Sequence, residues 1–221
     1  MKICELFTSV QGESTYAGLP CTFIRLAGCN LRCSYCDTRY SFGDGRGMDT
    51  DEIISYVKSS GIPLVEVTGG EPLMQGEETR QLVKRLLDGG YTVLVETNGS
   101  YGIQDLDRRA VVILDIKTPG SGVTGCACGS GEWLVNDPSN FSLLKKTDEV
   151  KFVIADRRDY EWARQTVQTY DLAGKCTVLF SPVPGMIEPR DLVAWILEDR
   201  LPVRLNLQIH KYIFGPEQRG V

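Results

Sequence analysis

The sequence predicts an α/β fold with the architecture of a single-domain open partial β/α barrel. Short segments rich in β-branched residues alternate with amphipathic helical segments, a pattern typical of parallel sheets with helical crossovers. Polar and glycine-rich segments follow several of the predicted strands, where parallel folds place their binding sites. Only about four helices are predicted, which is too few to surround a closed eightfold barrel.

The predicted strands are short and bounded by turn-forming residues. They span Ile3–Val10, Cys21–Ala27, Leu64–Thr68, Thr92–Glu96, Val111–Ile116, Glu149–Ile154, Cys176–Ser181 and Val203–His210.

The predicted helices each have an apolar stripe at helical spacing. The first begins at Asp49, which forms a capping-box pattern with Glu52. The others run from about Glu78 to Asp88, from about Asp159 to Tyr170, and onward from near Pro189. The tail after His210 contains Pro216 and two glycines, so we expect no helix there.

The bulk composition limits the class of protein. The chain has 221 residues and 42% hydrophobic content, enough for one core in a single domain spanning residues 1–221. A net charge of −5 lacks the basic surplus of a nucleic-acid binder, so we expect a small-molecule substrate and no direct nucleic-acid contact. No apolar run has the length of a membrane span, and the N-terminus does not resemble a signal peptide. We therefore expect a cytoplasmic protein without a membrane partner.

Three of the eight cysteines form a cluster in the sequence. Cys29, Cys33 and Cys36 have the spacing C-x3-C-x2-C directly after a predicted strand, so one loop can surround a single metal centre with thiolates. Three thiolates anchoring a 4Fe-4S cluster leave one iron without a protein ligand, and such an open position is what a reactive metal site needs. The alternative is a structural zinc site whose fourth ligand is Cys126, Cys128 or His210. Otherwise, Cys126 and Cys128 are expected to be free thiols.

A family resemblance extends over nearly the whole chain. The C-x3-C-x2-C loop is the signature of radical S-adenosylmethionine (SAM) enzymes. The flanking residues narrow the resemblance to the 7-carboxy-7-deazaguanine synthases; these residues are Val10 to Glu13, Phe23 to Arg32, Asp37-Thr38, Thr68 to Pro72, Glu96 to Gly99 and Gln208 to Lys211.

The resemblance implies a reaction and its cofactors. Enzymes of this family convert 6-carboxy-5,6,7,8-tetrahydropterin to 7-carboxy-7-deazaguanine with loss of ammonia, on the route to 7-deazapurines such as queuosine. A reduced 4Fe-4S cluster cleaves SAM, and the resulting 5′-deoxyadenosyl radical takes and later returns a substrate hydrogen. The protein supplies orientation and excludes water. An electron donor such as flavodoxin and a homodimer are also implied.

The resemblance assigns SAM contacts to residues on several predicted strand ends, namely Tyr35, Gly70, Glu71, Glu96, Asn98, Lys117 and Ser181. Glycine permits a close backbone approach, and Glu71 can neutralise the SAM ammonium group. The alternative for Gly69-Gly70-Glu71 is an ordinary strand-to-helix turn. Lys117 follows Asp115-Ile116 where some relatives have Ser-Pro, so its SAM contact stays open.

The substrate contacts implied by the resemblance are Val10, Gln11, Gly12, Glu13, Arg25, Thr68, Gln208 and Val221. An amide and a carboxylate match the donors and acceptors of a pterin edge, and the Arg25 fork matches a substrate carboxylate. The alternative for Arg25 is an outward charge on a half-buried strand. The alternative for Val221 is a frayed terminus.

A magnesium site is expected directly after the third cysteine. Asp37 and Thr38 provide the hard oxygen donors that Mg²⁺ prefers and that an iron–sulfur cluster does not use. The resemblance makes Thr38 the direct ligand, and Asp37 can instead cap backbone amides of the loop.

Two other functions are consistent with the cysteine loop. A glycyl-radical activating enzyme has the same loop, but it acts on a protein and has no need of the polar Gln11-Gly12-Glu13 segment. A zinc-stapled binding module would have no catalytic activity.

Overall fold

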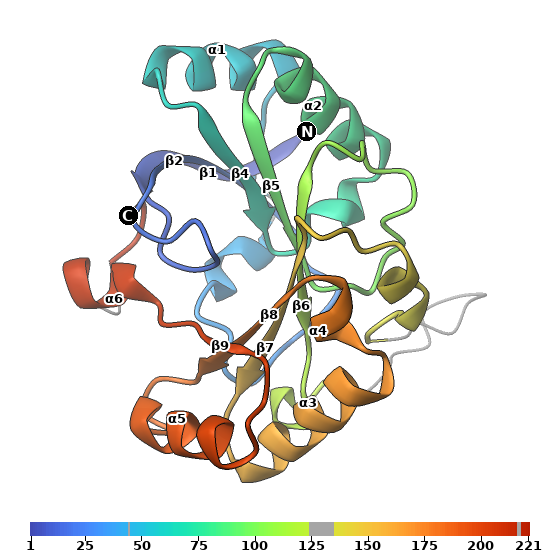
Figure 1. The fold of residues 1–221 in the computed structure, drawn as a ribbon. Coiled ribbons are helices and arrows are strands. Elements are labelled where there is room, and N and C mark those ends of the chain that lie inside the picture. Colours follow the sequence, from blue (N-terminus) through green and yellow to red (C-terminus); the bar gives the residue numbers. More distant parts are fainter. Residues whose placement is uncertain (44, 124–134, 216–217) are drawn as a thin grey trace.

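The computed structural model describes residues 1–43, 45–123, 135–215 and 218–221, and the strands of these residues form one open, twisted sheet (Figure 1). The strand order is β3-β1-β2-β4-β5-β6-β7-β8-β9. The strands are β1 (Lys2–Val10), β2 (Pro20–Leu26), β3 (Arg46–Gly47), β4 (Leu64–Gly69), β5 (Thr92–Thr97), β6 (Val111–Ile116), β7 (Glu149–Ile154), β8 (Thr177–Pro182) and β9 (Arg204–Leu205). The expected open partial barrel is confirmed.

The helices cover the outer face of this sheet, with α1 and α2 over one half and α3 and α5 over the other (Figure 1). Their bounds are α1 (Thr50–Ser60), α2 (Glu77–Asp88), α3 (Arg157–Thr169), α4 (Leu172–Lys175), α5 (Pro189–Glu198) and α6 (Ile209–Phe214). Short 3-10 helices are η1 (Arg39–Phe42), η2 (Pro72–Gln75), η3 (Pro119–Ser121) and η4 (Pro138–Ser142).

Alternation along each strand separates the core from the concave face. On β4, Val65 and Val67 point outward into the core beneath α1 and α2, whereas Glu66 and Thr68 line the cavity on the inside. The same alternation on β7 directs the Lys151 side chain into the cavity, whereas its neighbours Val150 and Phe152 lie in the core that packs against α3. Polar side chains therefore gather on the concave face beside a small apolar cluster that includes Leu64 and Leu94, and the main apolar core lies between sheet and helices.

The sequence-based expectation of a parallel sheet is wrong at one edge. From β2 to β9 the neighbouring strands are parallel, but β1 runs antiparallel to both β2 and β3. The connection from β1 to β2, residues 11–19, contains no helix. Because a parallel pair needs a crossover of about a dozen residues or more, this short loop requires the antiparallel arrangement.

The C-terminal part also differs from expectation. The predicted strand Val203–His210 is wrong beyond β9, and the tail expected to be irregular forms α6. After β9, the Asn206 side chain donates to Ser181 of β8 and accepts from the Ser14 backbone, so it joins β8 to the loop after β1. The backbone N–H of Ile209 then donates to the Gly12 carbonyl at 2.9 Å, at the first residue of α6.

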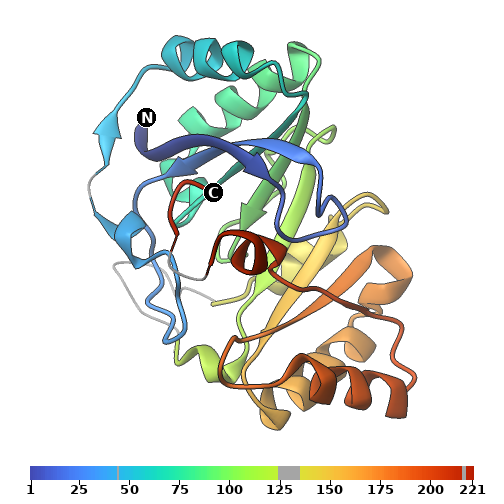
Figure 2. The ribbon, with the colours of Figure 1, turned by 90° about the vertical axis from the view of Figure 1, so that its left-hand side faces the viewer.

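This Gly12 contact belongs to a junction that bridges the two ends of the open sheet. Figure 2 shows the side on which the N-terminal strands and α6 meet. Across it, Thr15 donates to Glu149 on β7 and Gln208 donates to Glu13. A Cβ atom on residue 12 would lie 1.9 Å from Nδ1 of His210, so only glycine fits there.

The predicted capping box at the start of α1 is confirmed. The Asp49 side chain accepts from the Glu52 backbone N–H at 2.8 Å, and the Glu52 carboxylate accepts from the Asp49 N–H at 2.9 Å. This reciprocal pair satisfies backbone donors that the first turn of a helix leaves free.

We predict that Asp49→Ala lowers the free energy of unfolding by about 1 kcal/mol, because the cap is lost. The control is Asp51→Ala in the same turn, whose exposed pair with Arg85 should contribute less. Urea unfolding of both variants checks this. Equal stability of the two variants would contradict the prediction.

Candidate active site

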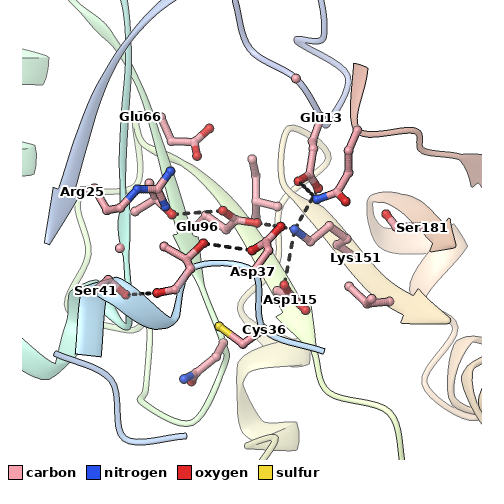
Figure 3. A pocket seen from close by; sticks show the side chains of 18 of the residues that line it. Glu13, Arg25, Cys36, Asp37, Ser41, Glu66, Glu96, Asp115, Lys151 and Ser181 are labelled. Atoms are coloured by element: carbon pink, nitrogen blue, oxygen red, sulfur yellow. Dashed lines mark hydrogen bonds and ion pairs between the residues drawn. The ribbon is translucent and has the colours of Figure 1, made fainter. Parts of the chain in front are cut away.

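One cavity at the carboxyl ends of the parallel strands brings together nearly all residues assigned from the sequence (Figure 3). Its lining includes the three clustered cysteines and Thr38; Tyr35, Gly70, Glu96, Asn98, Lys117 and Ser181; and Val10, Gln11, Gly12, Glu13, Arg25, Thr68, Gln208 and Val221. Glu71 does not line it.

The cysteine loop is fixed against the end of β4. The backbone N–H groups of Gly70 and Glu71 donate to the carbonyls of Leu26 and Gly28 at 3.1 and 2.9 Å. A Cβ on residue 70 would lie 2.1 Å from the Gly28 oxygen, so glycine is needed for this close approach. On the far side of the loop, the Ser34 backbone N–H donates to the Ser121 carbonyl at 2.8 Å. The loop is thus held at both ends.

The three thiols fit the role of cluster anchors. Cys29, Cys33 and Cys36 all line the cavity, and burial raises the pKa of each thiol, that of Cys33 to about 11. Thiols held neutral in this way would release their protons on binding iron. Lys117 lies close enough to oppose the rise in all three pKa values. Cys126 and Cys128 lie outside the described residues.

Glu71 has a different place from the one expected. Its carboxylate is fully buried and accepts from the backbone N–H groups of Leu73 and Asn98 and from the Thr97 hydroxyl, at 2.7–2.9 Å. The side chain therefore connects the turn after β4 to the end of β5. The structure does not bring it to the cavity, where it could meet the SAM ammonium group. Asn98 does line the cavity, and its amide donates to Asn30 in the cysteine loop.

Lys151, which the sequence analysis did not single out, lies at the centre of the charged groups. Its Nζ is 3.0 Å from Glu13 Oε2 and 3.3 Å from Asp115 Oδ2, and it also pairs with Glu96 (Figure 3). Its side chain is only 6% exposed. The sequence did contain a signal for a buried polar role of Lys151, because the alternation in Glu149-Val150-Lys151 places the lysine on the same face as Glu149.

Glu66 is a second buried group that the sequence analysis missed. It is 4% exposed on β4, and it accepts a hydrogen bond from the Gln11 amide. Among the described residues it has no ion-pair partner. Burial, together with the charges of Glu96 and Glu13, raises the pKa of Glu66 to about 8. This carboxyl group is therefore mostly protonated at neutral pH.

Arg25 is held by one nitrogen. Its Nε donates to Glu5 Oε2 at 3.1 Å, and the Tyr40 hydroxyl donates to the same oxygen. Among the described residues, no hydrogen bond or ion pair engages its two terminal nitrogens. The Arg219 guanidinium carbon lies 4.1 Å from the centre of the Tyr40 ring. The C-terminal segment thus contacts Tyr40, whose hydroxyl binds the same Glu5 carboxylate that holds Arg25. The fork of Arg25 lines the cavity and is available for a carboxylate.

The expected magnesium ligands lie at the rim of the cavity. Thr38 donates to Asp37 at 2.9 Å, and Asp37 accepts from Lys211 of α6 at 2.7 Å. Burial alone would raise the pKa of Asp37, but Lys211 and the hydrogen bonds lower it, so the group is a carboxylate. Asp37 thereby joins the cysteine loop to the C-terminal helix.

The fold and the cavity define a radical SAM enzyme, and a family model described as the Radical SAM superfamily matches residues 23–117. A 7-carboxy-7-deazaguanine synthase of Chlorobaculum tepidum is 46% identical over 100% of this chain and 97% of its own length. The corresponding protein of Koribacter versatilis is 43% identical over the full length of both. The chain belongs to the 7-carboxy-7-deazaguanine synthase family.

A solved structure supports the fold. The crystal structure of QueE from Escherichia coli superposes with a TM-score of 0.70 at 19% identity, covering 94% of this chain and 93% of that one. No helix in the described ranges is long and apolar enough to cross a membrane.

We predict that Glu66→Gln is more stable than the wild type near pH 8 and that this advantage shrinks toward pH 5. The folded state keeps a proton on Glu66 up to about pH 8, whereas the unfolded chain loses it near its ordinary pKa of 4.5. Wild-type stability therefore falls with rising pH in this window, by at most about 1.4 kcal/mol per pH unit. The substituted amide keeps an acceptor for Gln11. Urea unfolding at several pH values, with exposed Glu161→Gln as control, measures the difference. A pH-independent difference would contradict the prediction.

Proposed function

We propose that this protein converts 6-carboxy-5,6,7,8-tetrahydropterin to 7-carboxy-7-deazaguanine and ammonia. The observation that supports this most directly is that three cluster-forming thiols line the same cavity as a set of polar and oppositely charged side chains. A pterin has donors and acceptors along one edge and this substrate has a carboxylate beside its reacting ring, so the pocket and the substrate are complementary.

Cys29, Cys33 and Cys36 would hold the 4Fe-4S cluster, with SAM beside Gly70 and Asn98. When bound, this pair supplies the radical that activates a substrate C–H bond. The remaining steps depend on the chain's own residues. Gln11 and Glu13 orient the pterin edge, and the Arg25 fork holds the carboxylate. The barrel walls exclude water from the reacting ring.

The test is an anaerobic assay of the reconstituted protein with a strong reductant, SAM and the pterin, analysed by mass. We expect formation of 7-carboxy-7-deazaguanine, with SAM recovered. Cys33→Ala should form no product and bind less iron, since one of three anchors is lost. Cys176→Ala, which removes a buried thiol away from the cavity, should retain its cluster. Product from Cys33→Ala with normal iron content would reject the cluster assignment.

We predict that Arg25→Lys raises the KM for the pterin by about tenfold or more, because a single ammonium cannot replace a bidentate fork. Cluster absorbance and SAM binding should be unchanged, since the Arg25 side chain is held by Glu5 and not by the glycine turn or the cysteine loop. An Arg25→Lys protein with the wild-type KM would show that the fork does not bind substrate.

We further propose that Thr38 binds Mg²⁺ together with substrate oxygens and water. The position of a hydroxyl and a carboxylate at the cavity rim supports this, because Mg²⁺ takes few protein ligands and keeps several waters. The ion would stabilise negative charge on the substrate during ring contraction.

We predict that Mg²⁺ restores turnover to chelator-treated wild type and to Thr38→Ser but not to Thr38→Ala. Serine keeps the hydroxyl ligand that alanine lacks. Turnover after chelation and metal addition measures this. Full stimulation of Thr38→Ala by Mg²⁺ would exclude Thr38 as a ligand.

On the basis of family membership, we also propose that an electron donor such as flavodoxin reduces the cluster. We further propose that the protein is a homodimer and that it is cytoplasmic.

A further inference from the structure

We propose that Lys151 is a positioning residue that fixes Glu13 and Glu96 in the cavity wall and keeps Glu13 ionised to accept hydrogen bonds from the pterin. The inference rests on the proposed function and assigns a role within that site. Lys151 lines the cavity but would act through these two carboxylates (Figure 3).

The geometry of the ammonium group supports this role. Nζ of Lys151 is 3.0 Å from Glu13 and 3.3 Å from Asp115 and pairs with Glu96. An ammonium has three N–H donors, and three carboxylates surround this one. They come from three segments: the loop after β1, β5 and β6. One buried cation from β7 thus fixes three parts of the cavity wall relative to one another.

Glu13 and Glu96 depend on Lys151 more than Asp115 does. Asp115 has a second cation, since Lys117 Nζ lies 2.9 Å from its Oδ1. Among the described residues, Lys151 is the only cation in ion-pair contact with Glu13 or Glu96; their other partners are neutral. Gln208 donates to Glu13 at 2.7 Å, and Thr68 donates to Glu96 at 3.0 Å. Without the lysine, both carboxylates would remain in the cavity without a counter-charge.

Loss of the positive charge of Lys151 would change the hydrogen-bond acceptors that the cavity offers to a ligand. Carboxylates that share a buried site without a cation take up protons, because both like-charge repulsion and burial disfavour ionisation. Burial alone would raise the pKa of Glu13, but Lys151 and Gln208 outweigh it, and the pKa is lower than usual. A protonated Glu13 has fewer acceptor sites for pterin N–H groups. The other titratable and charged groups that act on Lys151, Glu13 or Glu96 are Arg25, Asp37, Glu66, Asp115, Lys117, Glu149 and His210.

The experiment compares Lys151→Met with Lys145→Met. Lys145 also pairs with a buried carboxylate, Asp148, but lies outside the cavity, so its variant reports the cost of losing a buried ion pair alone. For Lys151→Met we expect a KM for the pterin raised about tenfold near pH 6.5 and falling as the pH rises toward 8.5, where Glu13 ionises again. Wild type and Lys145→Met should show no such fall in KM. Cluster absorbance should be the same in all three proteins.

A second variant keeps the inference testable if Lys151→Met does not fold. Lys151→Arg retains the charge, and we expect a KM within about threefold of wild type with an unchanged pH profile. A raised but pH-independent KM in Lys151→Met would overturn the inference, as would a folded Lys151→Arg with a KM raised tenfold or more. Failure of the wild type to convert the pterin would instead reject the proposed function itself.

Discussion

Charge balance among buried side chains is the constraint on which this site depends. An ionised carboxylate is costly to bury unless a cation or several donors meet it. Lys151 forms ion pairs with Glu13, Glu96 and Asp115, and Arg25 forms one with Glu5. Glu66 has no such cation within the described part of the chain, and its raised pKa shows the consequence, because the acid keeps its proton. Within the described part of the chain, the two terminal nitrogens of Arg25 are left without an ion pair or hydrogen bond.

This charge balance is possible because of the alternation of the strands. Each parallel strand directs one set of side chains into the core beneath the helices and the other into the barrel. On the inner face the residues become polar toward the carboxyl end, as in the step from Leu64 to Glu66 to Thr68 on β4. Apolar side chains therefore close the bottom of the barrel, and polar ones form the site at its open end. The glycine turn and the cysteine loop then place the thiols at the same end.

Local patterns made most of the fold and much of the site predictable. Of the strands before Val203, all but the two-residue β3 were located to within one residue, and the Asp49 cap followed from its spacing to Glu52. What failed depended on distant contacts. The chain after β9 turns into α6 because residues near Gly12 bind it, and Glu71 turns inward because Asn98 offers it a backbone donor. Lys151 resembled an ordinary strand lysine, since its three acidic partners lie far away in the sequence.

The junction near Gly12 also determines how the open barrel is closed. Between the end of β1 and the start of α6, the chain segments on the two sides are joined mainly by side chains such as Gln208, Asn206 and Thr15, not by a ladder of main-chain hydrogen bonds. Side-chain contacts of this kind can be lost one by one, whereas a β-ladder opens cooperatively. A substitution of Gln208 or Asn206 would therefore loosen the closure of the barrel and leave every strand pair intact.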